Sequence, residues 1–362
     1  MRWGRRGRVA SSMLGLSLML AASSETPRIG NAPLYAVGVY TQDVDETARQ
    51  YERVFGVVPA DFKTASVVTP SGAMVKVRMD VVFFPNFYVK LQQPVSENGP
   101  YAEDLRAYGR SIQNIQLKVD GKSQDFPAIR AGMVRNGGRW TLGSASDPWA
   151  YVDFKETLGV TLEPASVGAS IAVQPAPHAT HAPLGTMPVT HVGFAVTNAS
   201  QAAKAYSKVF GIPLPPLTEV RDLQYPPGST WNMAAHLQVA RWRQGNVSVE
   251  LIESVGGPTP WSEFVEKRKG SGALLIGFDV GDRMDEVLRE LQDKGGKWIY
   301  GRPGGTQAYI DFRETLGLVV EITGTPRSAR GVLSLSLAKD ASTAASVLGA
   351  LAPTRWIEQL FD

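Results

Sequence analysis

The segment Pro188-Val-Thr-His-Val-Gly-Phe-Ala-Val196 decides the fold of this chain, and Val247-Ser-Val-Glu-Leu-Ile-Glu253 is its partner. Both segments alternate between mainly apolar positions and positions that are mostly small or polar. Successive side chains of a strand point to opposite faces of a sheet, so each segment predicts a strand with one apolar face. His191 and Glu250 would both lie on the face opposite to that one.

A helix is predicted between these two strands. Its N-cap is Asn198 or Ser200, and Gly211 ends it. Such a helix would cover the apolar faces of both strands. His191 and Glu250 would then line a hollow on the other side of the sheet.

Two pairs of matching segments indicate an internal repeat. Tyr51-Glu-Arg-Val-Phe-Gly56 matches Tyr206-Ser-Lys-Val-Phe-Gly211 at an offset of 155 residues. Ala150-Tyr-Val-Asp-Phe-Lys-Glu-Thr-Leu-Gly159 matches Ala308-Tyr-Ile-Asp-Phe-Arg-Glu-Thr-Leu-Gly317 at an offset of 158 residues. Repeats of this length indicate duplication, and a duplicated unit should have one fold. We interpret the chain as four βαβββ units in the order A, B, A′, B′.

Unit A shows the expected order of elements. A strand over Pro33–Tyr40 precedes a helix that ends at Gly56. Two or three strands are predicted after the helix, around Met74–Met79, Val81–Phe84 and Phe87–Gln92.

The length of 362 residues, 43% of them hydrophobic, is enough for two cores. A segment rich in alanine and proline separates the two halves and is interpreted as a linker. The predicted organisation is a signal peptide over 1–24, a domain over 33–165, the linker over 166–187, a second domain over 188–324 and a C-terminal extension over 325–362.

The first 24 residues are typical of a secretory signal, because an arginine-rich start precedes an apolar run from about Val9 to Ala22. That run is too short to span a bilayer comfortably. An uncleaved anchor or a misplaced start is the alternative. We expect an exported protein, periplasmic or secreted, with no stable membrane span after processing.

The charge and the absence of cysteine narrow the possible functions. The formal net charge of +3 falls to −1 when the four arginines of residues 1–22 are left out. The basic balance therefore belongs to the leader and does not argue for nucleic acid as a partner. Because the chain has no cysteine, it has neither a disulfide framework nor thiol chemistry.

The order of these motifs resembles the vicinal oxygen chelate superfamily, which includes glyoxalase I, methylmalonyl-CoA epimerase, extradiol dioxygenases and bleomycin-resistance proteins. The resemblance covers about residues 33–324. It implies an α+β fold in which four βαβββ modules form two glyoxalase-like domains, each a cupped mixed sheet. In that superfamily a divalent metal lies in the cup, with one ligand from the first and the last strand of each unit.

Carried over to the second domain, the resemblance implies ligand positions at His191, Glu250, Leu275 and Glu321. Strand alternation independently puts Glu321 on the face opposite Val320. One imidazole and two carboxylates suit Mn²⁺, Co²⁺, Ni²⁺, Fe²⁺ or Zn²⁺. Leu275 departs from the pattern and weakens the extradiol dioxygenase interpretation, which needs two histidines. A buried polar cluster without metal is the alternative.

In the first domain the same positions hold Ala36, Lys90, Asn114 and Glu163. A protonated lysine is a poor metal ligand. Its ammonium would take the place of the metal charge and pair with Glu163. We therefore predict that the first domain is a metal-free structural or oligomerising partner.

Further candidate site residues lie on the strand around Ala235–Ala240 and in the loop Pro213–Trp231. His236 alternates with apolar neighbours, so it is predicted to face the cup with Gln238, as a ligand or general base or as a hydrogen-bonded wall residue. Tyr225 and Trp231 would contact substrate if the loop forms a lid; an ordinary surface loop is the alternative.

The resemblance leaves three functions open. The first is a metal-dependent isomerase, epimerase or lyase acting on a small oxygenated substrate, in which Glu250 or Glu321 moves a proton. An extradiol-type dioxygenase is the enzymatic alternative. A metal-free protein that binds and sequesters a small molecule is the alternative of another class. A homodimer is a further expectation.

Overall fold

The computed structural model describes residues 29–119, 126–166, 183–231 and 233–324. The predicted leader, most of the predicted linker and the C-terminal extension lie outside these ranges. Within these ranges, no helix is both long enough and apolar enough to cross a membrane. The described part forms two eight-stranded sheets, one from each half of the chain.

The first sheet contains units A and B. Its strand order is β2-β3-β4-β1-β5-β8-β7-β6, so the two units meet at the antiparallel pair β1 and β5. The first unit is β1 (Leu34–Tyr40), α1 (Val44–Phe55), β2 (Ala60–Val68), β3 (Met74–Phe84) and β4 (Phe87–Pro94). The second is β5 (Ser111–Val119), α3 (Phe126–Arg135), β6 (Arg139–Leu142), β7 (Tyr151–Phe154), α4 (Lys155–Leu158) and β8 (Val160–Ser166).

The second sheet repeats this order as β10-β11-β12-β9-β13-β16-β15-β14, after a short 3₁₀ turn at Pro183–Thr186. Unit A′ is β9 (Val189–Ala195), α5 (Ala199–Phe210), β10 (Leu217–Val220), β11 (His236–Gln244) and β12 (Val247–Val255). Unit B′ is β13 (Gly272–Asp279), a 3₁₀ turn, α7 (Met284–Asp293), β14 (Lys297–Tyr300), β15 (Gln307–Phe312) and β16 (Leu318–Thr323). The predicted α+β class and the four βαβββ units are confirmed.

The strands of unit A differ from the prediction in two ways. Ala60–Val68 forms β2, an edge strand that the sequence did not reveal, because most of its side chains are exposed and no apolar face is visible. The predicted strands on either side of Asp80 are one continuous strand, β3, in which this carboxylate is buried.

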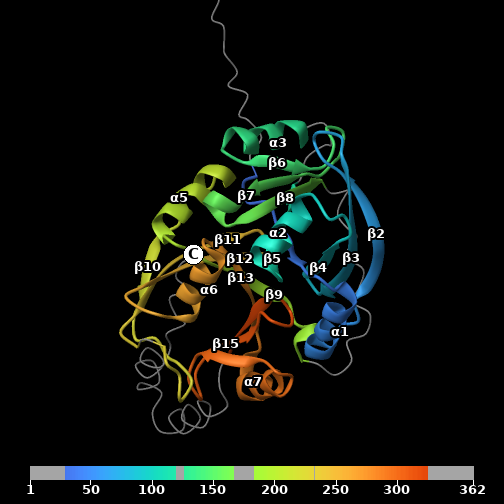
Figure 1. Ribbon diagram of the computed structural model, residues 1–362. Helices are drawn as coiled ribbons and strands as arrows, with labels where there is room; N and C mark the ends of the chain where they lie inside the picture. Colours follow the sequence, from blue (N-terminus) through green and yellow to red (C-terminus); the bar gives the residue numbers. More distant parts are fainter. Residues whose placement is uncertain (1–28, 120–125, 167–182, 232, 325–362) are drawn as a thin grey trace, which may run out of the picture.

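Two helices that were not predicted join the units within each half. They are α2 (Pro100–Tyr108) and α6 (Pro260–Arg268), and each has a proline in its first turn. Thr259 caps α6 and shares a capping box with Ser262. Figure 1 shows α2 and α6 close to the centre of the molecule, whereas α3 and α7 lie at opposite ends.

The helix between β9 and β12 begins and ends where the sequence indicates. Asn198 is the N-cap and accepts a hydrogen bond from the Gln201 backbone, and Gly211 takes the left-handed conformation at the C-terminus. Val192 and Leu251 lie on the helix side and belong to the main apolar core, which runs through both halves of the chain. His191 and Glu250 therefore lie on the opposite, cup side, as predicted.

The repeated motifs hold the two halves together reciprocally. The Tyr51 hydroxyl donates to the backbone carbonyl of Leu316 (3.0 Å), and the Tyr206 hydroxyl donates to that of Leu158 (3.1 Å). Each tyrosine thus reaches the Glu-Thr-Leu-Gly turn of the other half. All four residues are buried or lie in the shared core, so the halves form one packed body.

Candidate metal centre

Strand register brings the candidate ligands together on the cup side of the second sheet. His191 of β9 pairs with Gly277 of β13, and Gly277 pairs with Glu321 of β16. Glu250 of β12 lies beside Gly193 of β9. Residues paired in this way face the same side of a sheet. His191 and Glu321 are therefore separated by one strand, with a glycine between them.

Gly277 makes room for the imidazole. A Cβ atom at this position would lie 1.8 Å from Cε1 of His191, which is far inside van der Waals contact. Only a residue without a side chain allows the ring to cross β13 and reach the carboxylate beyond. The Nε2 atom of His191 lies 2.6 Å from Oε2 of Glu321.

Thr190 fixes the other nitrogen of the ring. Its hydroxyl lies 2.9 Å from Nδ1 of His191 and donates to the backbone carbonyl of Gly277 at 3.0 Å. Because the hydroxyl hydrogen is used on that carbonyl, the oxygen accepts from Nδ1–H. Nε2 is then the nitrogen that faces the carboxylates, which is the arrangement of a histidine ligand oriented by a neighbouring acceptor.

The two carboxylates are held differently. Glu321 is 1% exposed and is contacted at both oxygens, by His191 at Oε2 and by the Gln307 amide at Oε1. Glu250 is 3% exposed, and its Oε1 lies 2.8 Å from Nη2 of Arg241. Glu321 is therefore fixed within the cup, whereas Glu250 is paired with the guanidinium of Arg241.

Ligand atoms of His191, Glu250 and Glu321 all lie within 4.8 Å of one another. Burial disfavours the imidazolium, but the charges of Glu321 and Glu250 outweigh it and raise the pKa of His191 to about 9. Burial also raises the pKa of Glu250, against the attraction of His191 and Arg241. For Glu321 the burial effect is outweighed by His191 and Gln307, which lower its pKa. The imidazolium of His191 and the guanidinium of Arg241 together compensate the two carboxylates.

Leu275 lies at the fourth position that the resemblance implied. It pairs with Gly193, and its side chain covers that glycine: a Cβ atom there would lie 2.7 Å from Cγ of Leu275. Leu275 is fully buried. It therefore closes one side of the cluster with an apolar surface and offers no ligand atom.

Aromatic side chains form the wall next to the cluster. Trp261, Tyr300 and Tyr309 have ring centroids 5.1 to 5.4 Å apart, and Tyr309 pairs with Glu321 across β15 and β16. Tyr225 stacks edge-on against Tyr300. In the described part of the chain, neither the Trp261 indole nitrogen nor the Tyr225 hydroxyl has a hydrogen-bond partner, although both are buried.

Two of the predicted substrate residues, Tyr225 and Trp231, lie on the cup side. They pack on the apolar cluster that contains Leu275. The loop that carries them is not wholly irregular, because it contains the edge strand β10.

The prediction that His236 and Gln238 face the cup is wrong. Gln238 pairs with Glu253, which caps the N-terminal end of α5 on the helix side, and His236 lies on the same face. The Nε2 atom of His236 lies 3.3 Å from Glu219 on the edge strand. The structure therefore does not bring His236 to the cluster, and Arg241 of the same strand is there instead.

Sequence reasoning missed Arg241, Gln307 and Thr190. Arg241 pairs directly with Glu250 across β11 and β12. It shares its face with Leu237 and Val239, so a strand alternation counted from these two residues would have indicated it. Gln307 lies at the start of β15 and Thr190 directly precedes the histidine, and no local pattern distinguishes them from other polar residues.

The first sheet has an ion pair where the second has the cluster. Lys90 of β4 and Glu163 of β8 form a salt bridge with both side chains buried, as predicted. The Asn114 amide donates to Glu163 at 2.7 Å, and Lys90 also lies 3.3 Å from the Tyr151 hydroxyl. The ammonium thus supplies in the first cup the positive charge that a metal would supply.

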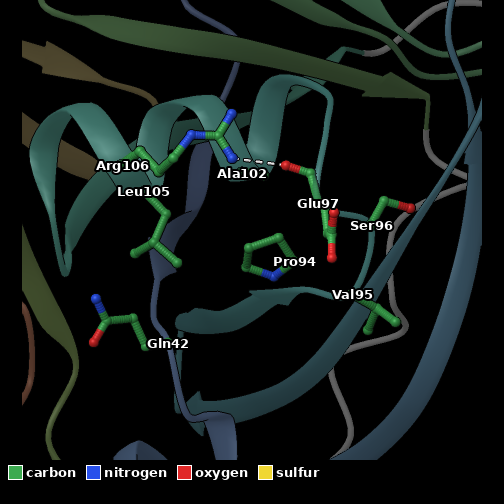
Figure 2. A pocket seen from close by; sticks show the side chains of 8 residues that line it. All are labelled: Gln42, Pro94, Val95, Ser96, Glu97, Ala102, Leu105 and Arg106. Atoms are coloured by element: carbon green, nitrogen blue, oxygen red, sulfur yellow. Dashed lines mark hydrogen bonds between the residues drawn. The ribbon is translucent and has the colours of Figure 1, made fainter.

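A surface pocket of about 480 Å³ lies between the end of β4 and α2. Figure 2 shows its lining, in which Arg106 donates to the backbone carbonyl of Glu97 at 2.7 Å. A second pocket lies beside α6. Neither is lined by His191, Glu250 or Glu321.

The chain is similar to known proteins in sequence and in fold. The family model described as the Glyoxalase/Bleomycin resistance protein/Dioxygenase superfamily matches residues 190–312. The uncharacterized protein YqjC of Bacillus subtilis (strain 168) is 30% identical over 137 residues, which cover 36% of this chain and 88% of that protein. A mutant of 4-hydroxymandelate synthase from Streptomyces coelicolor has a TM-score of 0.53 at 16% identity and covers 81% of this chain and 92% of its own. At that identity the likeness concerns the fold.

Proposed function

The chain belongs to the glyoxalase/bleomycin resistance protein/dioxygenase superfamily, and we propose that its second domain is a divalent-metal-dependent enzyme acting on a small oxygenated substrate. The proposed reaction is of isomerase, epimerase or lyase type. The observation that carries this proposal is the convergence of His191, Glu250 and Glu321 within 4.8 Å at a buried site.

The residues fit a divalent ion. Imidazole nitrogen and carboxylate oxygen are donors for Mn²⁺, Co²⁺, Ni²⁺, Fe²⁺ and Zn²⁺. Thr190 orients Nε2 of His191 toward the carboxylates, and Gly277 provides the space in which the ring lies. Two carboxylates buried this close repel each other unless a cation or a proton lies between them.

The side chains have distinct roles in the proposed reaction. A bound ion would polarise adjacent oxygens of the substrate and stabilise negative charge that develops there. His191 and Glu321 hold their positions, because each is fixed by a second contact. Glu250 moves the proton, because it lies toward the side of the site that is open to solvent. Arg241, which contacts its Oε1 atom and has a side chain 38% exposed, marks that side. The apolar wall at Leu275 and Tyr309 excludes water from the other side.

A metal-free binding protein is the second candidate function, and one observation favours it. Each carboxylate already has a cationic neighbour within the chain: Arg241 lies on Glu250, and His191 lies on Glu321. The charges of the cluster are therefore balanced without an ion. An extradiol-type dioxygenase would need a second histidine ligand, whereas Leu275 lies at the fourth position. The likeness to 4-hydroxymandelate synthase supports a dioxygenase only at the level of the fold.

Elemental analysis of protein purified without chelators tests the proposal. We expect about one divalent ion per chain in the parent protein and little in His191→Ala or Glu321→Gln. His236→Ala is the matched control, because it removes a histidine from the same sheet on the opposite face. Titration with Mn²⁺ should raise the thermal midpoint of the parent and of the control, since binding to the folded state stabilises it.

The two candidate functions give opposite results. A parent protein without metal, whose thermal midpoint does not respond to any of the five ions, would contradict the enzyme proposal and favour the metal-free binding protein. Uptake of oxygen by the loaded protein in the presence of a substrate would favour the dioxygenase.

A further inference from the structure

We propose that Arg241 binds the substrate, and that the substrate carries a carboxylate group. This inference rests on the proposed function and specifies its substrate class. Arg241 lies in one row of side chains with Glu250, Gly193 and Leu275, from β11, which is next to the edge strand β10, to the central strand β13. This row forms one side of the cluster, and Arg241 is the residue at its open end.

The position of the guanidinium suits it to contact a ligand. Its Nη2 atom touches the buried Glu250 carboxylate, whose side chain is 5% exposed, while the arginine side chain itself is 38% exposed. The group therefore reaches into the cluster, while part of the side chain remains open to solvent. A guanidinium has five N–H donors in a planar fork, so it can hold Glu250 and a second carboxylate together.

The charge of the loaded site indicates a monoanion. A divalent ion is neutralised by Glu250 and Glu321, and a histidine that ligates an ion does so as neutral imidazole. With Arg241 included, the loaded site then has one net positive charge. A carboxylate with an adjacent oxygen matches that charge and offers neighbouring oxygens to the ion, whereas a phosphate dianion carries one charge too many.

The surroundings of Arg241 indicate an apolar group on the same substrate. Leu237 and Val239 lie on its face of β11. Leu237 belongs to the apolar cluster that also contains Leu275 and Tyr309, and Val239 packs against that cluster. A ligand held by its carboxylate at Arg241 would place the rest of its body against this wall. An aromatic 2-hydroxy acid combines all three features, and mandelate is a suitable probe.

Calorimetric binding to the Mn²⁺-loaded protein tests the proposal with mandelate and its neutral counterpart mandelamide. We expect the parent to bind mandelate at least roughly tenfold more tightly, since charge-assisted hydrogen bonds distinguish the two. Arg241→Gln should lose this preference and retain Mn²⁺ binding. Arg241→Lys should keep part of it, because the charge remains and the planar fork does not. Arg243→Gln is the matched control: Arg243 lies on the same strand, and its contacts are backbone carbonyls of the β11–β12 turn.

Several outcomes would overturn the inference. Equal affinity of the parent for mandelate and mandelamide, or mandelate binding unchanged in Arg241→Gln, would show that Arg241 only neutralises Glu250. Tighter binding of phenyl phosphate than of mandelate would refute the carboxylate as the recognised group. If the parent binds no Mn²⁺, the proposed enzyme fails, and the same probes on the metal-free protein decide the role of Arg241 separately.

Discussion

Thr190 and His191, neighbours in the sequence, are joined by a hydrogen bond of 2.9 Å that decides which nitrogen of the imidazole faces the cluster. The consequence can be tested on Thr190→Val, which keeps the shape of the side chain and removes the acceptor. We expect Mn²⁺ affinity to fall by roughly 10- to 100-fold, as is usual when an outer contact of a histidine ligand is lost. Thr190→Ser retains the hydroxyl and should stay close to the parent. Parental affinity in Thr190→Val would show that the ring is oriented by packing alone.

The glycine under the imidazole gives a second prediction. Gly277→Ala introduces a Cβ atom at a point 1.8 Å from the ring of His191, so the ring must move away from Glu321. We expect Mn²⁺ binding to weaken at least roughly tenfold, because ligand positions must hold to a fraction of an ångström. Gly270→Ala is the control, since a Cβ atom there meets nothing within 4 Å. Isothermal titration with Mn²⁺ measures both, and equal affinities would refute the prediction.

In the first cup, Lys90→Met should destabilise the protein by about 3 to 5 kcal/mol, because it leaves the Glu163 carboxylate buried without its cation. The double variant Lys90→Met with Glu163→Gln should recover more than half of that loss, since no charge is then buried. Urea unfolding measures the free energies of both. Additive losses in the double variant would mean that the two charges are not coupled.

Asp80 provides a prediction about pH. Burial, together with the charge of Asp61 on the neighbouring strand, raises the pKa of Asp80 from 3.8 to about 6. Because the folded state holds this proton more tightly than the unfolded state, stability falls as the pH rises from about 4 to about 6. The loss persists above pH 6.

Asp80→Asn should therefore stabilise the protein at pH 7 by about 1 to 2 kcal/mol, a value reduced for partial solvent screening. It should also flatten the pH dependence between pH 4 and 6, as followed by urea unfolding. Asp61→Asn removes only the neighbouring charge and should have a smaller effect in the same direction. An unchanged slope in Asp80→Asn would contradict the assignment.

Local sequence patterns gave the sheet face on which the cluster residues lie, and the family resemblance identified them as ligand positions. Alternation in two strands put His191 and Glu250 on one face, and the same rule placed Glu321. The repeated motifs indicated the duplicated fold, and the reciprocal contacts of Tyr51 and Tyr206 show why those motifs matter for packing.

The face of β11 that enters the cup could not be predicted in the same way. This strand has apolar residues on both faces, with Leu237 and Val239 on one and Ala240 and Trp242 on the other. Which face enters the cup depends on pairing with β12, where a shift of one residue exchanges all side chains. The contacts of Arg241 and Gln307 depend on such long-range register, and for that reason sequence reasoning placed His236 in the cup.

The reciprocal packing of Tyr51 and Tyr206 between the halves has a consequence for how the two cups came to differ. Two identical subunits assembled from separate copies would have to accept every substitution in both cups at once. Because both halves here belong to one polypeptide, Lys90 can replace an acid in one cup while Glu250 stays in the other. The fused pair can therefore differ at equivalent positions, with a buried salt bridge in the first cup and the cluster of His191, Glu250 and Glu321 in the second.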